Sequence, residues 1–262
     1  MVLCSVSFAS GSTMDPSESK NVPELSVVIL CYRAGKEIAS FVEQIDTELH
    51  AAEIDFELVL VANYDEGTDD PTPKIATELA EREPRYRCVC QVKQGRMGWD
   101  MRSGLSEATG HLVAVIDGDG QMPSSDIVPL FRLMSSGQYD LAKTFRAKRH
   151  DGAYRKIMSS IYNWLFHILF RPEVRFRDVN AKPKIITREA LTRLNLVSND
   201  WFTDAEIMIE ATDRKLRVCE LSTVFYENER RSSFVSFGTA FEFVGNLFYY
   251  RFLRTRKSRS ES

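Results

Sequence analysis

The chain has 262 residues, of which 44% are hydrophobic, and a formal net charge of −3 at pH 7. A chain of this length can bury a large core as one α/β domain. The slight acidic excess argues against a general nucleic-acid-binding protein, because such proteins carry a domain-wide surplus of Lys and Arg. The five cysteines are odd in number and lack metal-site spacing, which indicates reduced thiols in a cytosolic protein.

The two ends of the chain differ in composition from its middle. Residues 1–22 are rich in serine and small residues, without the basic start and long apolar stretch of a signal peptide, so we expect a disordered tail. Residues 23–225 form the predicted domain. Residues 226–262 combine aromatic residues with a basic end, which predicts a separate amphipathic segment.

Apolar, β-branched runs alternate with amphipathic stretches along the first 150 residues. The predicted strands are Leu25–Leu30, Phe56–Val61, Arg87–Val92, Leu112–Ile116 and Tyr139–Thr144. The predicted helices between them are Lys36–His50, Thr72–Glu83 and Trp99–Ala108. This alternation predicts an α/β fold with a mostly parallel sheet and helices on both faces. In such folds ligands bind at the carboxyl ends of the strands.

The most informative motif is Asp117-Gly118-Asp119-Gly120, which follows a buried strand. Two carboxylates one residue apart, with Gln121 next, form a hard-oxygen site suited to Mg²⁺ or Mn²⁺. The glycines let a phosphate and its ion approach the backbone closely. Enzymes that use a nucleoside diphosphate commonly carry such a pair at a strand end, although a solvated acidic turn has a similar sequence.

Several segments in sequence order resemble family 2 glycosyltransferases of GT-A fold, in particular the polyprenyl-phosphate branch that includes dolichol-phosphate mannose synthase. The segments are Val27–Tyr32, Leu58–Asp70, Gly98–Gly104, Asp117–Gln121 and Asp178–Lys184. The resemblance covers roughly residues 24–225. It implies a glycosyltransferase with a GT-A, Rossmann-like nucleotide-binding domain.

The resemblance also implies roles for individual residues. Contacts with the nucleotide-sugar would come from Tyr32, Asn63, Asp65, Gly98, Arg102, Asp117 and Gly118. Asp117, Asp119 and Gln121 would hold the Mg²⁺ or Mn²⁺ that neutralises the leaving diphosphate, which places Asp119 among the catalytic residues. The acceptor phosphate would meet Arg146, Arg155 and Lys182, and Asp204 is the acid expected near the acceptor.

Two segments suggest contact with a membrane surface. The stretch Ile157–Phe170 is apolar and aromatic except for a narrow polar arc, and Phe234–Leu253 is an aromatic segment followed by basic residues. Both are typical of helices that lie in a membrane interface, and anionic headgroups would attract the basic tail. An ordinary core helix, or self-association of the chain as a homo-oligomer, explains the same patterns.

The sequence predicts a metal-dependent, inverting transfer from a nucleoside-diphosphate sugar to a polyprenyl phosphate, by a peripheral enzyme at the cytoplasmic face of a membrane. One alternative is a glycan or other hydroxyl acceptor with Asp204 as general base. Another is a non-catalytic, sugar-nucleotide-binding partner subunit, because Arg33-Ala34 and Ala62-Asn63 depart from the residues usual in the family. Thr203 and Glu206 have the spacing of a helix capping box.

Overall fold

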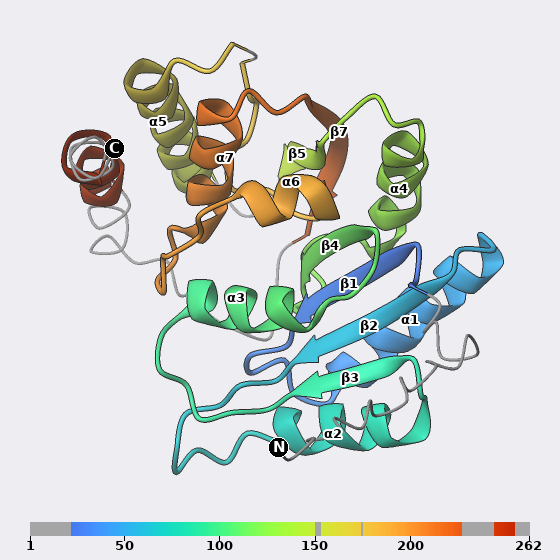
Figure 1. Ribbon diagram of the computed structural model, residues 1–262. Helices are drawn as coiled ribbons and strands as arrows, with labels where there is room; N and C mark the ends of the chain where they lie inside the picture. Colours follow the sequence, from blue (N-terminus) through green and yellow to red (C-terminus); the bar gives the residue numbers. More distant parts are fainter. Residues whose placement is uncertain (1–21, 150–152, 174, 227–243, 255–262) are drawn as a thin grey trace, which may run out of the picture.

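A single seven-stranded sheet organises the molecule (Figure 1). The computed structural model describes residues 22–149, 153–173, 175–226 and 244–254. The sheet order is β3-β2-β1-β4-β6-β5-β7. The strands are β1 (Leu25–Leu30), β2 (Phe56–Val61), β3 (Tyr86–Val89), β4 (Leu112–Asp117), β5 (Leu141–Arg149), β6 (Lys184–Thr187) and β7 (Val218–Phe225). Every neighbouring pair is parallel except those made by β6, which runs antiparallel to both β4 and β5.

Helices cover both faces of this sheet, as the sequence predicts (Figure 1). The helices are α1 (Glu37–Ala51), α2 (Thr72–Arg82), α3 (Met97–Glu107), α4 (Ile127–Ser135), α5 (Ala153–Phe170), α6 (Arg188–Arg193) and α7 (Thr203–Asp213). The core cluster on one face includes residues of α1, α2 and α4, and the cluster on the other includes residues of α3, α5, α6 and α7. All residues of β1 and β2 are buried, which explains why both sequences are apolar except for Ser26 and Glu57. These two buried side chains satisfy each other, because the Ser26 hydroxyl donates to Glu57 Oε1 at 2.7 Å.

The elements predicted from sequence are present, with differences at their ends. Strand β3 is shorter than predicted, β5 extends beyond Thr144 to Arg149, and α5 begins before Ile157. Strands β6 and β7 were not predicted, because Lys184 and Glu220 interrupt their apolar patterns.

The carboxyl-terminal segment is described only in part. Residues 244–249 are helical and continue into a π-helical turn, Tyr250–Arg254. Leu247 and Tyr250 are buried in the same core cluster as α5 and α7. The predicted tail over 1–22 lies outside the described residues except for Val22, and so do residues 227–243 and 255–262 of the predicted amphipathic segment. Within the described ranges, no helix combines the length and apolar character needed to cross a membrane.

Gly104 sets how closely α3 approaches the sheet. A Cβ atom at this position would lie 2.5 Å from Val28 Cγ1 and 2.5 Å from Val61 Cγ2. We therefore expect Gly104→Ala to lower the free energy of unfolding by about 1–3 kcal/mol, because overpacking outweighs the gain in helix propensity. Urea denaturation measures the change. Ser106→Ala, on the exposed side of the same helix, is the control and should shift stability by less than about 0.5 kcal/mol.

Candidate active site

The Asp117–Gln121 loop lies where β4 ends, at the carboxyl edge of the parallel strands. Asp117 is the last residue of β4, and the Gly118 amide donates to the Leu30 carbonyl at the end of β1. A Cβ at Gly118 would lie 2.9 Å from Ile38 Cδ1, so only glycine fits between the strand ends and α1. The Asp119 carboxylate accepts a hydrogen bond from the backbone N–H of Gln121 at 3.1 Å, which folds the loop back on itself.

Lys182 joins this loop to α7. Its Nζ lies 3.1 Å from Asp117 Oδ1 and 2.8 Å from Asp204 Oδ2, and its side chain is 2% exposed. Burial alone would lower the pKa of Lys182, but the two carboxylates outweigh it and raise that pKa. The structure thus brings together Asp117, Lys182 and Asp204, three of the predicted site residues, and places Lys182 between the two carboxylates.

Asp204 is shared by two lysines. Its Oδ1 accepts from Lys184 Nζ at 2.5 Å, while its Oδ2 faces Lys182. Burial would raise the pKa of Asp204, but the two ammonium groups outweigh it and hold the pKa below its usual value. A carboxylate with so low a proton affinity is a poor general base. This arrangement weighs against the predicted alternative in which Asp204 deprotonates a hydroxyl.

A third buried lysine lies beside this pair. Lys143 of β5 is the cross-strand partner of Lys184, and its Nζ contacts Glu220 Oε1 at 3.0 Å and the Asp178 carbonyl. Burial is the main cause that lowers the pKa of Lys184 to about 8. Repulsion by Lys143 and Lys182 also lowers this pKa, whereas attraction by Asp204 raises it. Lys143 was not among the site residues predicted from sequence, whereas Lys184 was considered beside Lys182 as a source of positive charge near the acceptor. The sequence pattern that pointed to charge here is the pair Lys182 and Lys184, which flank Pro183 between apolar residues.

The donor set at the strand end fits a divalent ion. Asp117 and Asp119 supply carboxylates, and the Gln121 side chain supplies an amide whose Nε2 donates to the Tyr226 carbonyl. The described residues contain no cluster of three or more His, Cys, Asp or Glu that could hold a metal alone. Mg²⁺ commonly binds through one or two protein carboxylates together with substrate phosphates. The chemistry of the loop therefore suits an ion that arrives with a diphosphate.

A second polar group lies at the ends of β1 and β2. The Tyr32 hydroxyl donates to Asp65 Oδ2 at 2.5 Å, and Arg33 Nη2 lies 3.1 Å from the same oxygen. Burial, with the bond to Asp65, raises the pKa of Tyr32 to about 12, so the phenol stays protonated at neutral pH. Lys93 Nζ lies 4.1 Å from the centre of the Tyr32 ring. Tyr32 and Asp65, both predicted to contact the nucleotide, therefore lie together.

Asn63 is buried and fully committed to its neighbours. Its Nδ2 donates to Asp100 Oδ1 at 3.0 Å and to Ser103 Oγ at 3.1 Å, and its Oδ1 accepts from the Gln91 amide. Asp100 also pairs with Lys93. Asn63 therefore fixes the loop after β2 on α3, and its contact with a nucleotide stays a prediction.

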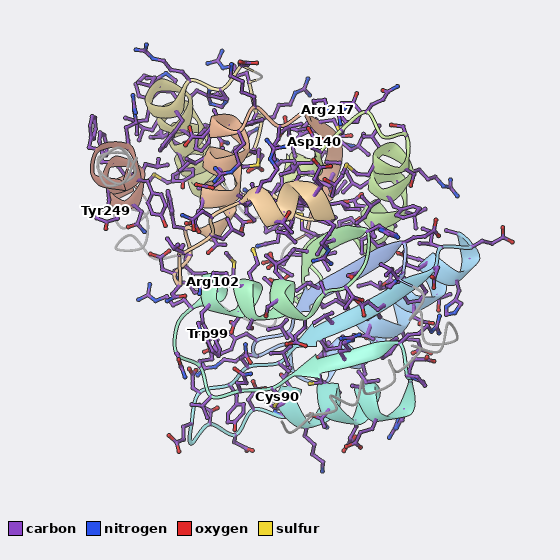
Figure 2. The ribbon with its side chains drawn as sticks, viewed as in Figure 1. Cys90, Trp99, Arg102, Asp140, Arg217 and Tyr249 are labelled. Carbon is purple, nitrogen blue, oxygen red and sulfur yellow. The ribbon has the colours of Figure 1, made fainter. Side chains whose placement is uncertain are left out.

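Gly98 and Arg102 of α3 also contact protein. The Gly98 amide donates to the Asp200 carbonyl at 2.8 Å, so it is not presented to a phosphate. Arg102 Nη1 donates to the Val197 carbonyl and to Asn199 Oδ1, both at 2.9 Å. Figure 2 shows Arg102 on α3. Gly98 and Arg102 thus both hold the segment that precedes α7, and their contact with the nucleotide-sugar stays a prediction.

The predicted acceptor cations differ in their surroundings. Arg146 of β5 binds Asp178 in a bidentate pair, with Nε 2.6 Å from Oδ2 and Nη2 2.8 Å from Oδ1. Its guanidinium also lies 5.3 Å from the Phe225 ring, which packs with Met122 and Ala181 beside the Asp117–Gln121 loop. The side chain of Arg155 lies outside the described residues.

The predicted capping box at Thr203 and Glu206 is wrong. Phe202 is the N-cap of α7, and Glu206 accepts instead from the amides of Val197 and Ser198, at 2.9 and 3.0 Å. Glu206 also accepts from the Tyr250 hydroxyl at 3.0 Å. The acid therefore ties α7 to the preceding loop and to the carboxyl-terminal helix.

The fold and the strand-end site suit a glycosyltransferase, and the comparison with known families agrees. Residues 26–197 match Glycosyl transferase family 2. The chain belongs to this family, which confirms the resemblance seen in the sequence and the predicted enzyme class, a glycosyltransferase.

Curated relatives of this chain include transferases named for polyprenyl phosphates. Undecaprenyl-phosphate 4-deoxy-4-formamido-L-arabinose transferase of Yersinia enterocolitica is 26% identical over 151 residues, 57% of this chain and 45% of the relative. Glycosyltransferase AglD of Haloferax volcanii is 28% identical over 207 residues, 75% of this chain and 32% of the relative. Dodecaprenyl-phosphate galacturonate synthase of Rhizobium johnstonii is 24% identical over 255 residues, which are 95% of this chain and 73% of the relative. The chain thus spans less than half the length of the first two.

Solved structures share the fold at low sequence identity. Mannosyl-3-phosphoglycerate synthase from Rubrobacter xylanophilus has a TM-score of 0.68 and 15% identity, and the match covers 89% of this chain and 75% of that one. Glucosyl-3-phosphoglycerate synthase from Mycobacterium tuberculosis, in complex with Mn²⁺, UDP and phosphoglyceric acid, has a TM-score of 0.66 and 20% identity. That match covers 87% of this chain and 78% of the synthase. These likenesses confirm the predicted α/β fold.

The lowered pKa of Lys184 predicts a pH dependence of stability. Its pKa is about 8 in the folded protein and 10.5 for an unperturbed lysine, so between these values the unfolded chain binds more protons. The contribution of Lys184 to the free energy of unfolding therefore rises with pH in this window, by on the order of 1 kcal/mol per pH unit.

Urea denaturation of wild type and Lys184→Met across this window measures the effect. The difference in unfolding free energy, wild type minus variant, should increase with pH. Lys215→Met, which changes an exposed lysine, is the control and should give a flat difference. A wild-type advantage that falls with rising pH contradicts the assignment.

Proposed function

We propose that this protein transfers a sugar from a nucleoside-diphosphate sugar to a polyprenyl phosphate, aided by Mg²⁺ or Mn²⁺, at the cytoplasmic face of a membrane. The observation that carries the proposal is the strand-end site, where Asp117 lies 3.1 Å from the buried ammonium of Lys182 and Asp119 follows in the same loop. Opposite charges at the end of a parallel sheet suit a substrate that carries both a metal-bound diphosphate and a second anion. Relatives named for polyprenyl-phosphate transfer support the acceptor.

Three residues of the strand-end loop would hold the ion. Asp119 supplies a carboxylate and Gln121 a side-chain carbonyl oxygen, and Asp117 contributes its carboxylate when Lys182 withdraws from it. When bound, the ion stabilises negative charge on the leaving diphosphate. Tyr32 and Asp65 lie at the neighbouring strand ends, where they would border the nucleoside.

The charges around Asp204 favour a phosphate acceptor over a hydroxyl. A phosphate monoester is already an anionic nucleophile at neutral pH, so it requires cations rather than a base. Lys143, Lys182 and Lys184 supply buried positive charge, and Asp204 is bound to two of them. In this role Asp204 is a positioning residue that fixes the ammonium groups.

An exposed apolar stripe supports attachment to a membrane surface. On α5 the exposed residues Ile157, Ile161, Trp164 and Ile168 recur every three or four positions, so they form one face. On the carboxyl-terminal helix, Phe248, Tyr249 and Phe252 are exposed, and Figure 2 shows Tyr249 at the outer margin of the molecule. An unpartnered aromatic face of this kind suits the boundary between headgroups and acyl chains. Self-association through the same face is the competing explanation.

The transfer reaction is tested by release of nucleoside diphosphate. UDP- and GDP-sugars are screened with Mn²⁺ or Mg²⁺, with and without a short-chain polyprenyl phosphate. We expect release that depends on the lipid and falls at least about 100-fold in Asp119→Ala, because charge on the leaving group loses its counter-ion. Asp55→Asn is the control, since Asp55 is exposed and precedes β2 at the opposite edge of the sheet.

The alternatives give different results in the same assay. Release that requires a glycan and ignores the lipid supports a hydroxyl acceptor, and Asp204→Asn should then abolish most of the rate and remove the acidic limb of the pH–rate profile, where the rate rises as the base loses its proton. Nucleotide binding without release for any donor and acceptor supports the non-catalytic subunit and contradicts the proposal.

Membrane attachment is tested by sedimentation with vesicles of phosphatidylglycerol and phosphatidylcholine. Trp164 is 56% exposed, and Trp164→Glu should lower the partition coefficient about tenfold or more because it replaces an inserted indole by a charge. Val22→Glu, which changes an exposed apolar residue before β1, is the control. Loss of a dimer in Trp164→Glu, without any vesicle binding by wild type, favours self-association instead.

A further inference from the structure

The carboxylate that ends β4 already has a cation. Lys182 Nζ lies 3.1 Å from Asp117 Oδ1 and donates to Asp117 Oδ2 at 3.2 Å, so the ammonium faces both oxygens. The Lys182 side chain is 2% exposed, whereas that of Asp117 is 34% exposed. Solvent and ligands therefore reach Asp117 from one side while Lys182 contacts it from the protein side.

A divalent ion on Asp117 would compete with this lysine. An ion bound at ordinary Mg²⁺–oxygen distances of about 2.1 Å would lie within a few ångströms of the ammonium. Like charges at that separation repel strongly in a partly buried site, where the effective dielectric constant is well below that of water. Asp117 therefore cannot bind both cations fully at the same time.

The protein offers Lys182 a second partner. Asp204 Oδ2 lies 2.8 Å from Lys182 Nζ on the buried side, and Met97 Sδ accepts from the same nitrogen at 3.3 Å. If Lys182 moves away from Asp117, its charge remains compensated by Asp204. Asp204 stays neutralised in turn, because Lys184 contacts its other oxygen at 2.5 Å.

We propose that Lys182 is an internal counter-ion that occupies Asp117 until a divalent ion displaces it, so that ion binding and withdrawal of Lys182 toward Asp204 are one exchange. The inference rests on the proposed function, which requires the ion. The exchange weakens binding of a bare ion and favours an ion that brings its own anionic ligands, because a diphosphate restores the charge balance that Lys182 otherwise provides.

The experiment measures Mn²⁺ binding to the protein alone by electron paramagnetic resonance, without any sugar donor. In Lys182→Met we expect Mn²⁺ to bind about tenfold more tightly or better than in wild type, since the competing charge is gone. Lys215→Met is the control. It removes an exposed lysine that pairs with Glu173, so its Mn²⁺ affinity should stay within about twofold of wild type.

A second comparison uses UDP and GDP as added ligands. Nucleoside diphosphate should tighten Mn²⁺ binding more in wild type than in Lys182→Met, because only wild type has a charge to displace. Circular dichroism and thermal unfolding establish that each variant is folded. Lys182→Gln, which keeps a polar group between the two carboxylates, takes the place of Lys182→Met if the latter does not fold.

Equal Mn²⁺ affinity in wild type and the Lys182 variant overturns the inference, and so does an equal gain in Lys215→Met, which would reflect general loss of charge. The result is independent of sugar transfer. A protein that shows the exchange but releases no nucleoside diphosphate contradicts the proposed function alone, and one that transfers sugar with no effect of Lys182 on Mn²⁺ contradicts this inference alone.

Discussion

A chain of alternating charges, Asp117–Lys182–Asp204–Lys184, holds the functional end of the molecule together. Isolated buried charges are costly, and each of these is tolerated because it contacts a group of opposite sign. The chain joins three parts of the fold: the end of β4, the segment entering β6, and the first turn of α7. Removing Lys182 or Asp204 takes a charge partner from both of its neighbours, so the relative positions of these elements depend most on these two central residues.

The reversed direction of β6 makes this contact possible. Residue pairs Val115–Lys184 and Lys143–Lys184 place the first residue of β6 beside the last part of β4 and the early part of β5. Because β6 is antiparallel to its neighbours, the residues just before it reach the carboxyl edge of the sheet. A parallel strand would have brought its opposite end there. One reversed strand thus delivers Lys182 to the edge that carries Asp117.

This arrangement also explains how one site can serve two anions. The strand-end loop provides oxygen ligands on its exposed side, and the lysines provide positive charge on its buried side. Asp204 orients that charge and has too low a proton affinity to act as an effective base. Family membership gives the reaction class, and the separation of oxygen donors from ammonium groups is the physical reason to favour a diphosphate donor together with a phosphate acceptor.

The sequence by itself determined the parallel strands, the helices between them, and the strand-end position of Asp117 and Asp119, because these follow from local apolar periodicity and from chain order. It also indicated the family, confirmed by comparison. Only the tertiary structure decided the partners of the charged groups. Arg102 and Gly98 contact the segment before α7, and Asp204 is bound by two lysines. Such pairing depends on which distant segments become neighbours in the sheet. Strand β6 could not be recognised from sequence, because a short segment that begins with Lys184 after a proline is typical of a loop.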